Sequence, residues 1–263
     1  MMRLIGEICA KLFSSLFWLL HNRSRLAFSR EEIRWMQVSY SQFGEDLIVE
    51  RLAQELGISN GMYVDVGAFD PIAFSNTLKL HKLGWNGVNI DMNPAKVARF
   101  AALRQNDVNV CAAVGEGPAG TIQAFVVDRG TSYEKLHVGE QPSGKAEPVA
   151  ISLRTLTDIL GASRFAGKRI DYLNIDCEGM DFAVIQTLDM KKYSPRIVSI
   201  EALDDEAFSE IQHWMSAKCY RLVDKLHWTL FFVADSKNAS AEAPRGHSAS
   251  VSATSRTSSD TTR

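Results

Sequence analysis

The chain has 263 residues, a length that suits one α/β domain with extensions rather than several domains. Hydrophobic residues make up 46% of it, enough for a full core, and the net charge is −2. This balance lacks the concentrated basic face that nucleic-acid binding requires, so we expect no nucleic-acid partner. The four cysteines are scattered without a Cys-x-x-Cys pair, which indicates reduced thiols in a cytoplasmic protein rather than disulfides or a zinc site.

The first 30 residues differ from the rest of the chain. Apolar residues recur at helical spacing, and Arg3, Glu7 and Lys11 form two i,i+4 charge pairs on one stripe. The apolar run is too short and too charged to span a bilayer, and no signal-peptide cleavage site follows it. We expect an in-plane helix that places residues 1–25 peripherally on the inner face of the membrane. The alternative is a helix that packs on the domain or on a second copy of the chain.

Two short strands separated by a helix-sized segment are the most informative feature of the sequence. Residues 62–66 predict a buried strand, and Gly67 and Ala68 leave its carboxyl end without bulk, so that a ligand can approach the backbone. A second strand, 87–91, ends in Asp91, 24 residues after Gly67. A carboxylate at this place in an α/β unit typically accepts hydrogen bonds from two ribose hydroxyls. The pattern predicts a nucleoside-binding crevice.

The turn after the first strand indicates which nucleoside binds. A dinucleotide site needs three glycines in the pattern G-x-G-x-x-G, because pyrophosphate must approach a bare helix N-terminus. This turn has only Gly67, and Asp65 and Asp70 would repel phosphate while attracting an ammonium or sulfonium group. We therefore expect S-adenosylmethionine rather than NAD. The plainer interpretation is that Asp65 and Asp91 are only turn or cap residues.

Strands and helices alternate along the rest of the domain. The expected helices are 41–56 with Ser41 as N-cap, 75–83, 94–104, 155–160, 181–188 and 206–218. The further expected strands are 108–113, 122–127, 149–153, 170–176, 196–200, 220–223 and 229–234. Residues 128–148 are rich in Gly and Pro and predict a long functional loop that helps to build the acceptor pocket. This order predicts an α/β fold with a doubly wound, mostly parallel sheet and a C-terminal antiparallel hairpin.

Acidic residues gather where the predicted parallel strands end. Ligands of such sheets bind at the carboxyl ends of the strands, so one rim should collect these residues. The residues expected there are Asp65, Gly67, Asp91, Asp176, Glu178 and Glu201.

Asp176 and Glu178 are the candidate catalytic residues. A carboxylate there could orient an acceptor hydroxyl or take its proton as a general base. With Glu201, the same carboxylates could bind a hard cation such as Mg²⁺, which would lower the pKa of a hydroxyl. The alternative is that Asp176 holds the cofactor and Glu178 caps the helix that follows Gly179.

Five motifs in this order resemble the FkbM-type methyltransferases, a family that uses S-adenosylmethionine. They are Ser41–Asp46, Val64–Ala68 with Ser75–Thr77, Asn89–Asp91, Ala112–Gly115 and Ile175–Gly179. The resemblance runs from about Ser41 to Glu201 and implies a Rossmann-like, seven-stranded sheet whose last strand is reversed. It also implies methyl transfer, often to hydroxyls of glycans or secondary metabolites. The cofactor-binding residues implied are Asp65, Gly67, Ala68, Ser75, Asn76, Asp91 and Ala112.

Two departures from the family pattern loosen the transfer of detailed roles. Phe69 and Pro71 stand where family members often carry Asn and Gly, and Asn174 stands where Lys is frequent. The cofactor assignment is unaffected.

We expect an O-methyltransferase that acts on a carbohydrate or glycan. The alternatives are an N-methyltransferase of a small amine or peptide, and a cofactor-binding interaction module without catalysis. The expected organisation is an amphipathic helix at 1–30 and a methyltransferase domain at 36–235. A Ser/Thr-rich tail at 236–263 cannot bury enough apolar surface to fold, so we expect it to be disordered.

Overall fold

The computed structural model describes residues 30–117, 119–127, 135–138 and 146–235. The chain divides into two units. The first ends at Val38, and its described part holds the short helix α2 (Arg30–Trp35). The second begins at Ser39 and holds every other described element. The predictions for residues 1–25 and for the tail at 236–263 fall outside the described residues. No helix within the described residues is long and apolar enough to cross a membrane.

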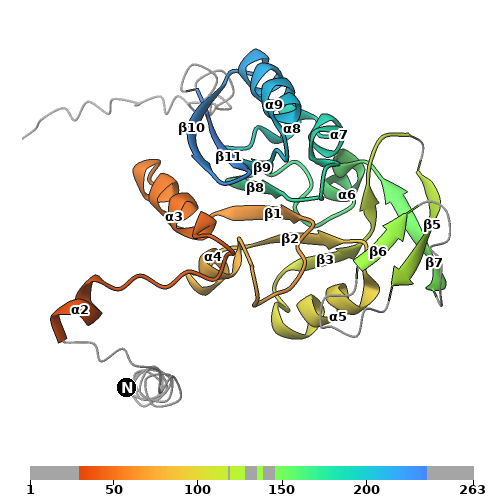
Figure 1. Cartoon of the computed structure of the whole chain (residues 1–263), viewed down its shortest axis with the longest axis horizontal. Helices are drawn as coiled ribbons and strands as arrows, with labels where there is room; N and C mark the ends of the chain where they lie inside the picture. The colour runs from red at the N-terminus through yellow and green to blue at the C-terminus, as the bar shows by residue number, and fades with distance from the viewer. Residues whose placement is uncertain (1–29, 118, 128–134, 139–145, 236–263) are drawn as a thin grey trace, which may run out of the picture. The chain divides into compact units, whose positions relative to one another are not determined.

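A seven-stranded sheet forms the centre of the second unit, in the order β10-β11-β9-β8-β1-β2-β3 (Figure 1). Its strands are β1 (Met62–Val66), β2 (Asn86–Asp91), β3 (Val108–Cys111), β8 (Tyr172–Ile175), β9 (Ile197–Glu201), β10 (Tyr220–Leu226) and β11 (Thr229–Ala234). All neighbouring pairs are parallel except those of β11, which runs antiparallel to both β9 and β10. The predicted mostly parallel sheet with a C-terminal hairpin is confirmed.

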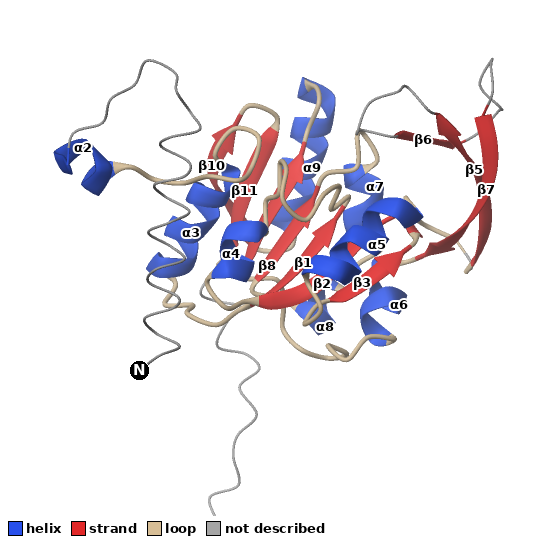
Figure 2. Ribbon diagram, turned by 90° about the horizontal axis from the view of Figure 1, so that it is seen from below, coloured by secondary structure: helices blue, strands red, loops and turns tan. Residues whose placement is uncertain are grey.

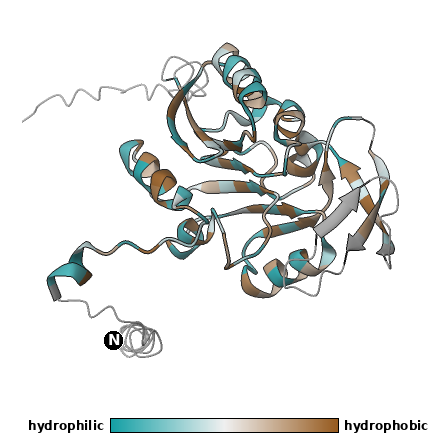
Figure 3. Cartoon of the chain, viewed as in Figure 1, coloured by the Kyte–Doolittle hydropathy of each residue, from teal (hydrophilic) through white to brown (hydrophobic). Residues whose placement is uncertain are grey.

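Helices cover both faces of this sheet. They are α3 (Glu45–Glu55), α4 (Leu78–Lys82), α5 (Pro94–Leu103), α6 (Leu156–Gly161), α7 (Asp181–Gln186), α8 (Met190–Tyr193) and α9 (Asp205–Ala217). Side chains of β1 alternate between the two faces. Met62, Val64 and Val66 pack in a core with residues of α6 to α9, whereas Tyr63 packs with residues of α3 and α4. Figure 3 shows the hydrophobic residues concentrated along the central strands.

A second sheet of four strands was not predicted. Its order is β4-β7-β5-β6, and it lies beyond the β3 edge of the main sheet (Figures 1 and 2). The strands are β4 (Ala113–Val114), β5 (Gly120–Val127), β6 (Lys135–Val138) and β7 (Ala146–Arg154). The expected loop at 128–148 was therefore wrong in part, because β6 and the start of β7 pair with β5. The strand expected at 108–113 divides at Ala112, after which β4 pairs with β7.

Two helix starts differ from the prediction. Helix α3 begins at Glu45 rather than Ser41, although the Ser41 hydroxyl still accepts hydrogen bonds from the backbone N–H groups of Gly44 and Asp46. Helix α4 begins at Leu78, because residues 75–77 serve as a polar entry turn in which Ser75 Oγ accepts the Leu78 N–H. The short helix α8 was not predicted.

Polar side chains form a row across the middle of the main sheet. Strand register places Ser199, Asn174, Asp65, Asn89 and Asn109 next to one another on β9, β8, β1, β2 and β3. Ser199 Oγ donates to Asn174 Oδ1 (2.6 Å), Asn174 Nδ2 donates to Asp65 Oδ1 (2.9 Å), and Asn89 Nδ2 donates to Asn109 Oδ1 (2.9 Å). The first four are buried. Because buried polar groups are costly unless they are paired, this row fixes the register of five strands.

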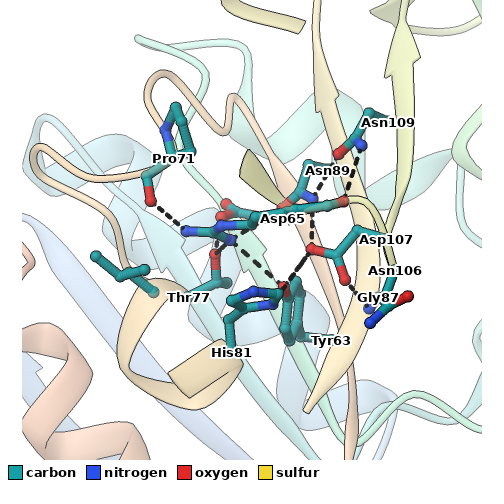
Figure 4. A network of polar contacts seen from close by, with 12 residues as sticks. Tyr63, Asp65, Pro71, Thr77, His81, Gly87, Asn89, Asn106, Asp107 and Asn109 are labelled. Carbon is teal, nitrogen blue, oxygen red and sulfur yellow. Dashed lines mark hydrogen bonds and ion pairs between the residues drawn. The ribbon is translucent and has the colours of Figure 1, made fainter. Parts of the chain in front are cut away.

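The guanidinium of Arg104 completes the row from the end of α5. It is 1% exposed and donates to Thr77 Oγ1 (2.8 Å), the Pro71 carbonyl (2.8 Å) and Ser75 Oγ (2.9 Å). Thr77 Oγ1 in turn donates to Asp65 Oδ2 (2.7 Å). One buried cation thus fastens the chain between β1 and α4 to the sheet, as Figure 4 shows around Pro71, Thr77 and Asp65.

Asp107, just before β3, anchors the opposite side of the same network. Its carboxylate accepts from Tyr63 Oη (2.5 Å), Asn89 Nδ2 (3.0 Å) and the Gly87 N–H (3.1 Å) (Figure 4). Arg104 also donates to Tyr63 Oη (3.4 Å). Asp65 and Asp107 therefore sit as two buried carboxylates around one buried guanidinium.

Gly67, directly after β1, faces the neighbouring strand. Its φ is +76°, and a Cβ on it would lie 1.8 Å from the carbonyl oxygen of Asp176. The expectation that this glycine leaves room for a ligand needs a correction, because the missing side chain makes room for the backbone after β8.

We predict that Gly67→Ala is more destabilising than Gly167→Ala in urea unfolding. Gly167 has nearly the same φ, +70°, but nothing lies within 4 Å of its added Cβ. In both variants, the left-handed backbone conformation should lower the free energy of unfolding by about 1–2 kcal/mol. The clash at Gly67 should cost about 1–3 kcal/mol more. Equal losses for the two variants would show that the strands can separate freely.

We predict that Arg104→Met lowers the free energy of unfolding by about 3–5 kcal/mol, because two buried carboxylates lose their countercharge. Arg104→Lys should recover little of this, since an ammonium cannot span the Pro71 carbonyl and the Thr77 hydroxyl as the guanidinium fork does. The control Arg221→Met removes an exposed arginine of β10 and should change stability by less than about 0.5 kcal/mol. A loss for Arg104→Met as small as the control's would contradict the network's role.

Candidate active site

Asp91 ends β2 with a firmly oriented carboxylate. Oδ2 accepts the Phe69 N–H (3.0 Å) and Oδ1 accepts the Asn93 N–H (2.7 Å), while Lys96 Nζ lies 4.0 Å away. Burial raises the pKa of Asp91, and Lys96 opposes this shift. The side chain keeps 10% of its surface exposed, and each oxygen retains a lone pair for a further donor. The geometry suits a pair of hydroxyl groups.

The turn after β1 is built from its own backbone and side chains. The N–H groups of Gly67 and Ala68 both donate to the Ile90 carbonyl, so neither points to a ligand. Asp70 accepts the N–H groups of Ile72 and Ala73 and forms an ion pair with Arg99. The suggestion that Asp70 attracts a cationic ligand was therefore wrong, because it is a turn residue with its own partner.

The expected rim position of Asp65 was also wrong. Asp65 is the penultimate residue of β1, so its side chain points to a face of the sheet, where Thr77 and Asn174 bond both oxygens. Burial raises its pKa. Its role is to hold residues 75–77 and β8 in place. Ser75 has the same character, since it is buried and accepts from Arg104.

Asn76 and Ala112 lie near the carboxyl ends of β1 and β3. Asn76 Nδ2 donates to Asn174 Oδ1 (3.3 Å), while Asn76 Oδ1 is buried with no hydrogen-bond partner among the described residues. Such an acceptor is suited to a ligand's N–H group. Ala112 is buried, and its N–H donates to the Asp91 carbonyl, which supports the end of β2.

A pocket of about 300 Å³ lies over the ends of β8 and β9. Its walls come from the loop before α3, from the residues that follow these two strands, and from the turn between β10 and β11. The lining residues are Gln42, Phe43, Glu45, Asp176, Glu178, Glu201, Leu203, His227, Trp228 and Thr229. Sequence reasoning found three of its four carboxylates but gave no site role to Glu45, Phe43 or Trp228.

Asp176 lies in the pocket among other carboxyl groups. Its pKa is raised to about 8, chiefly because protein atoms crowd the side chain and also because Glu201, Asp181 and Glu178 repel its negative charge. The residue is nevertheless exposed to solvent at the pocket surface. Perturbed carboxyl groups in clefts are typical of functional sites.

Glu178 lines the pocket two residues after Asp176. Asp181 holds the turn that follows, accepting the N–H groups of Cys177 (2.7 Å) and Gly179 (2.9 Å). Glu178 itself has a φ of +54°, an uncommon conformation for a residue other than glycine. The alternative that Glu178 caps the following helix stays a prediction.

The expectation of a bound Mg²⁺ finds no support. No group of three His, Cys, Asp or Glu side chains within the described ranges is arranged to hold a metal ion. Although Asp176, Glu178 and Glu201 share the pocket, we assign no metal to them.

The Asp91 region and the acidic pocket occupy neighbouring stretches of one sheet edge. The Asp176 N–H donates to the Val66 carbonyl, and the backbone of Asp176 packs against Gly67. A ligand held by Asp91 above β1 and β2 would thus have the pocket of β8 and β9 beside it. This arrangement suits a reaction between two bound molecules.

Comparison with known proteins gives one family match. The methyltransferase FkbM domain matches residues 65–222. No curated protein matches the chain significantly. Among solved structures, a TehB-like SAM-dependent methyltransferase from Corynebacterium glutamicum is 11% identical with a TM-score of 0.37, covering 73% of this chain and 85% of that one. The delta-N METTL16 MTase domain is 9% identical with a TM-score of 0.36, covering 72% and 80%.

The family assignment rests on the domain match rather than on these two structures. The match begins at Asp65, near the end of β1, and includes β2, β8 and β9, and thus both Asp91 and the carboxylates at the ends of β8 and β9. Because it spans more than half of the chain, this protein belongs to the FkbM methyltransferase family and is a methyltransferase that uses S-adenosylmethionine.

Proposed function

We propose that the protein methylates a hydroxyl group of a carbohydrate, with Asp176 as the general base. The observation that carries this proposal is the position of Asp176 among three further carboxylates in the pocket next to the Asp91 region, where its pKa is raised to about 8. A general base works best when its pKa lies near the working pH. The surrounding carboxylates supply acceptors for the several hydroxyl groups of a sugar.

The donor would lie along the ends of β1 and β2. Asp91 fits the two ribose hydroxyls, because both of its oxygens are oriented by backbone N–H groups and still accept further bonds. Asn76 Oδ1 fits the ammonium of the methionine part, because it is a buried acceptor with no partner among the described residues. When bound, S-adenosylmethionine supplies a methyl group on a positively charged sulfur.

The residues of the pocket act on the acceptor. Asp176 takes the hydroxyl proton while the acceptor oxygen forms its bond to the methyl carbon and the carbon–sulfur bond breaks. Glu178 and Glu201 accept hydrogen bonds from neighbouring hydroxyls and so position the reacting oxygen, which is where most of the rate gain of such a displacement arises. No metal is needed for this proton transfer.

N-methylation of an amine is the second candidate. Four of the lining side chains are carboxylates, and none of the lining residues in the described part of the chain is Lys or Arg. An amine would bind there as its ammonium and lose a proton to the same base before it reacts. The position of the new methyl group, on oxygen or nitrogen, distinguishes the two candidates.

We predict that Asp91→Ala weakens binding of S-adenosylmethionine about tenfold or more, the loss expected when a charge-assisted hydrogen bond is removed. Calorimetric titration measures this directly. The control Asp205→Ala removes an exposed carboxylate from the first turn of α9 and should leave affinity unchanged. An unchanged affinity for Asp91→Ala would exclude Asp91 from the donor site.

We predict that kcat/KM rises with pH and levels off above about 8, because only ionised Asp176 can accept the proton. Asp176→Asn should lower the rate about 100-fold or more and remove this rise, with little change in donor affinity. Formation of S-adenosylhomocysteine on a glycan extract gives the rate. A fully active Asp176→Asn enzyme would refute the assignment.

A further inference from the structure

Three aromatic rings from distant parts of the chain meet at the pocket. The ring centroids of Phe43 and His227 are 4.0 Å apart, and Trp228 lies 6.4 Å from Phe43 and 6.2 Å from His227. Phe43 is 41% exposed and Trp228 is 49% exposed. We call these three residues the aromatic rim. Large rings left exposed beside a cavity are available to a ligand.

Carboxylates line the same cavity as the aromatic rim. Glu45 is 4% exposed and accepts the Phe43 N–H at 2.9 Å, so one rim residue is fixed directly to one of the carboxylates. Asp176, Glu178 and Glu201 line the rest. The cavity therefore combines π-faces with negative charge, and its described lining contains no lysine or arginine.

This combination favours one class of ligand. The face of an aromatic ring attracts a cation, and carboxylates attract it further, whereas a neutral sugar gains from neither effect. We propose that the methyl acceptor carries a positively charged amine, which binds between the aromatic rim and the carboxylates while its hydroxyl faces Asp176. The inference rests on the proposed function for the reaction, but it concerns recognition of the acceptor, which the proposed function leaves open.

An acceptor of this class would also help the base. A cation within the pocket stabilises the ionised form of Asp176, so binding the correct acceptor increases the fraction of carboxylate that can take a proton. A neutral acceptor would leave the mutual repulsion of Asp176, Glu178 and Glu201 in place. The positive charge of the acceptor would thus serve both its binding and the ionisation of Asp176.

A pair of probes that differ only in charge tests the recognition. Choline and 3,3-dimethyl-1-butanol have the same shape and both carry a hydroxyl, but only choline is cationic. In titrations with S-adenosylhomocysteine present, choline should bind at least about tenfold more tightly, and less tightly as salt rises. Equal binding of the two probes, or binding of neither, overturns the inference.

Pocket variants locate the binding site of choline. Trp228→Ala should weaken its affinity about fivefold to thirtyfold, as expected for a lost cation–π contact, and Glu178→Gln should weaken it as well. The matched controls are Trp35→Ala, which removes a tryptophan that is 81% exposed on α2, and Glu210→Gln, which neutralises an exposed glutamate of α9. Both controls should bind choline normally. Unchanged affinity in both pocket variants also overturns the inference.

A labelling experiment separates this inference from the proposed function. The enzyme is incubated with methyl-labelled S-adenosylmethionine and a polar extract, and the products are divided by ion exchange at pH 7. The label should enter the cationic fraction, and acetylating the primary and secondary amines of the extract beforehand should remove it from every acceptor that carries such an amine. Label on a neutral or anionic oxygen-methylated product overturns the inference and leaves the proposed function standing. Label on nitrogen, or no label at all, contradicts the proposed function, and the choline titrations then decide the inference independently.

Discussion

A buried guanidinium holds the binding edge of this protein in place. Arg104 is almost fully excluded from solvent and bonds the Pro71 carbonyl, Ser75 and Thr77, all in the segment between β1 and α4. Thr77 passes this connection to Asp65 in the middle of the sheet. A buried charge without partners is very costly. Once the helix before Arg104 has formed, the segment between β1 and α4 therefore favours the one backbone conformation that supplies these partners. In this conformation the Phe69 N–H donates to Asp91 and Asn76 donates to Asn174, so the segment also positions the residues proposed to bind the methyl donor.

The two halves of the sheet edge differ in the number of charged side chains that they carry. Over β1 and β2 the polar groups are few and oriented by the backbone, with Lys96 near Asp91. Over β8 and β9 four carboxylates share one pocket, and their repulsion contributes to the raised pKa of Asp176. Gly67 joins the two regions, because its lack of a side chain lets β1 approach the backbone of Asp176. Catalysis by positioning requires this proximity, since methyl transfer needs donor and acceptor in line.

Local patterns in the sequence predicted the strands and several site residues. Apolar runs followed by an acid located Asp91, Asp176 and Glu201, because burial and strand length determine where a parallel strand ends. Asp65 was misplaced, because β1 continues one residue beyond it and its buried side chain is bonded by Thr77 and Asn174. The strands within 128–148 were hidden by the Gly and Pro residues on either side of β6 and by Pro148 in β7.

Features that depend on tertiary contacts could not be found in the sequence. Arg104 reads as an ordinary helix end, and its burial follows only when residues 71–77 fold over it. The contact between Phe43 and the turn at His227 joins segments from opposite ends of the domain, and nothing in either segment indicates the other. Glu178 was identified by its motif, but only the structure shows that Asp181 bonds the backbone of the turn after β8.

The crystal structure of the complex with S-adenosylhomocysteine tests the central claim most directly, namely that donor and acceptor occupy the two halves of one sheet edge. We predict that both ribose hydroxyls lie within hydrogen-bonding distance of Asp91, that the ammonium lies at Asn76 Oδ1, and that the sulfur faces the pocket of Asp176. A ligand that fills the acidic pocket itself, or whose ribose lies away from Asp91, would contradict this account.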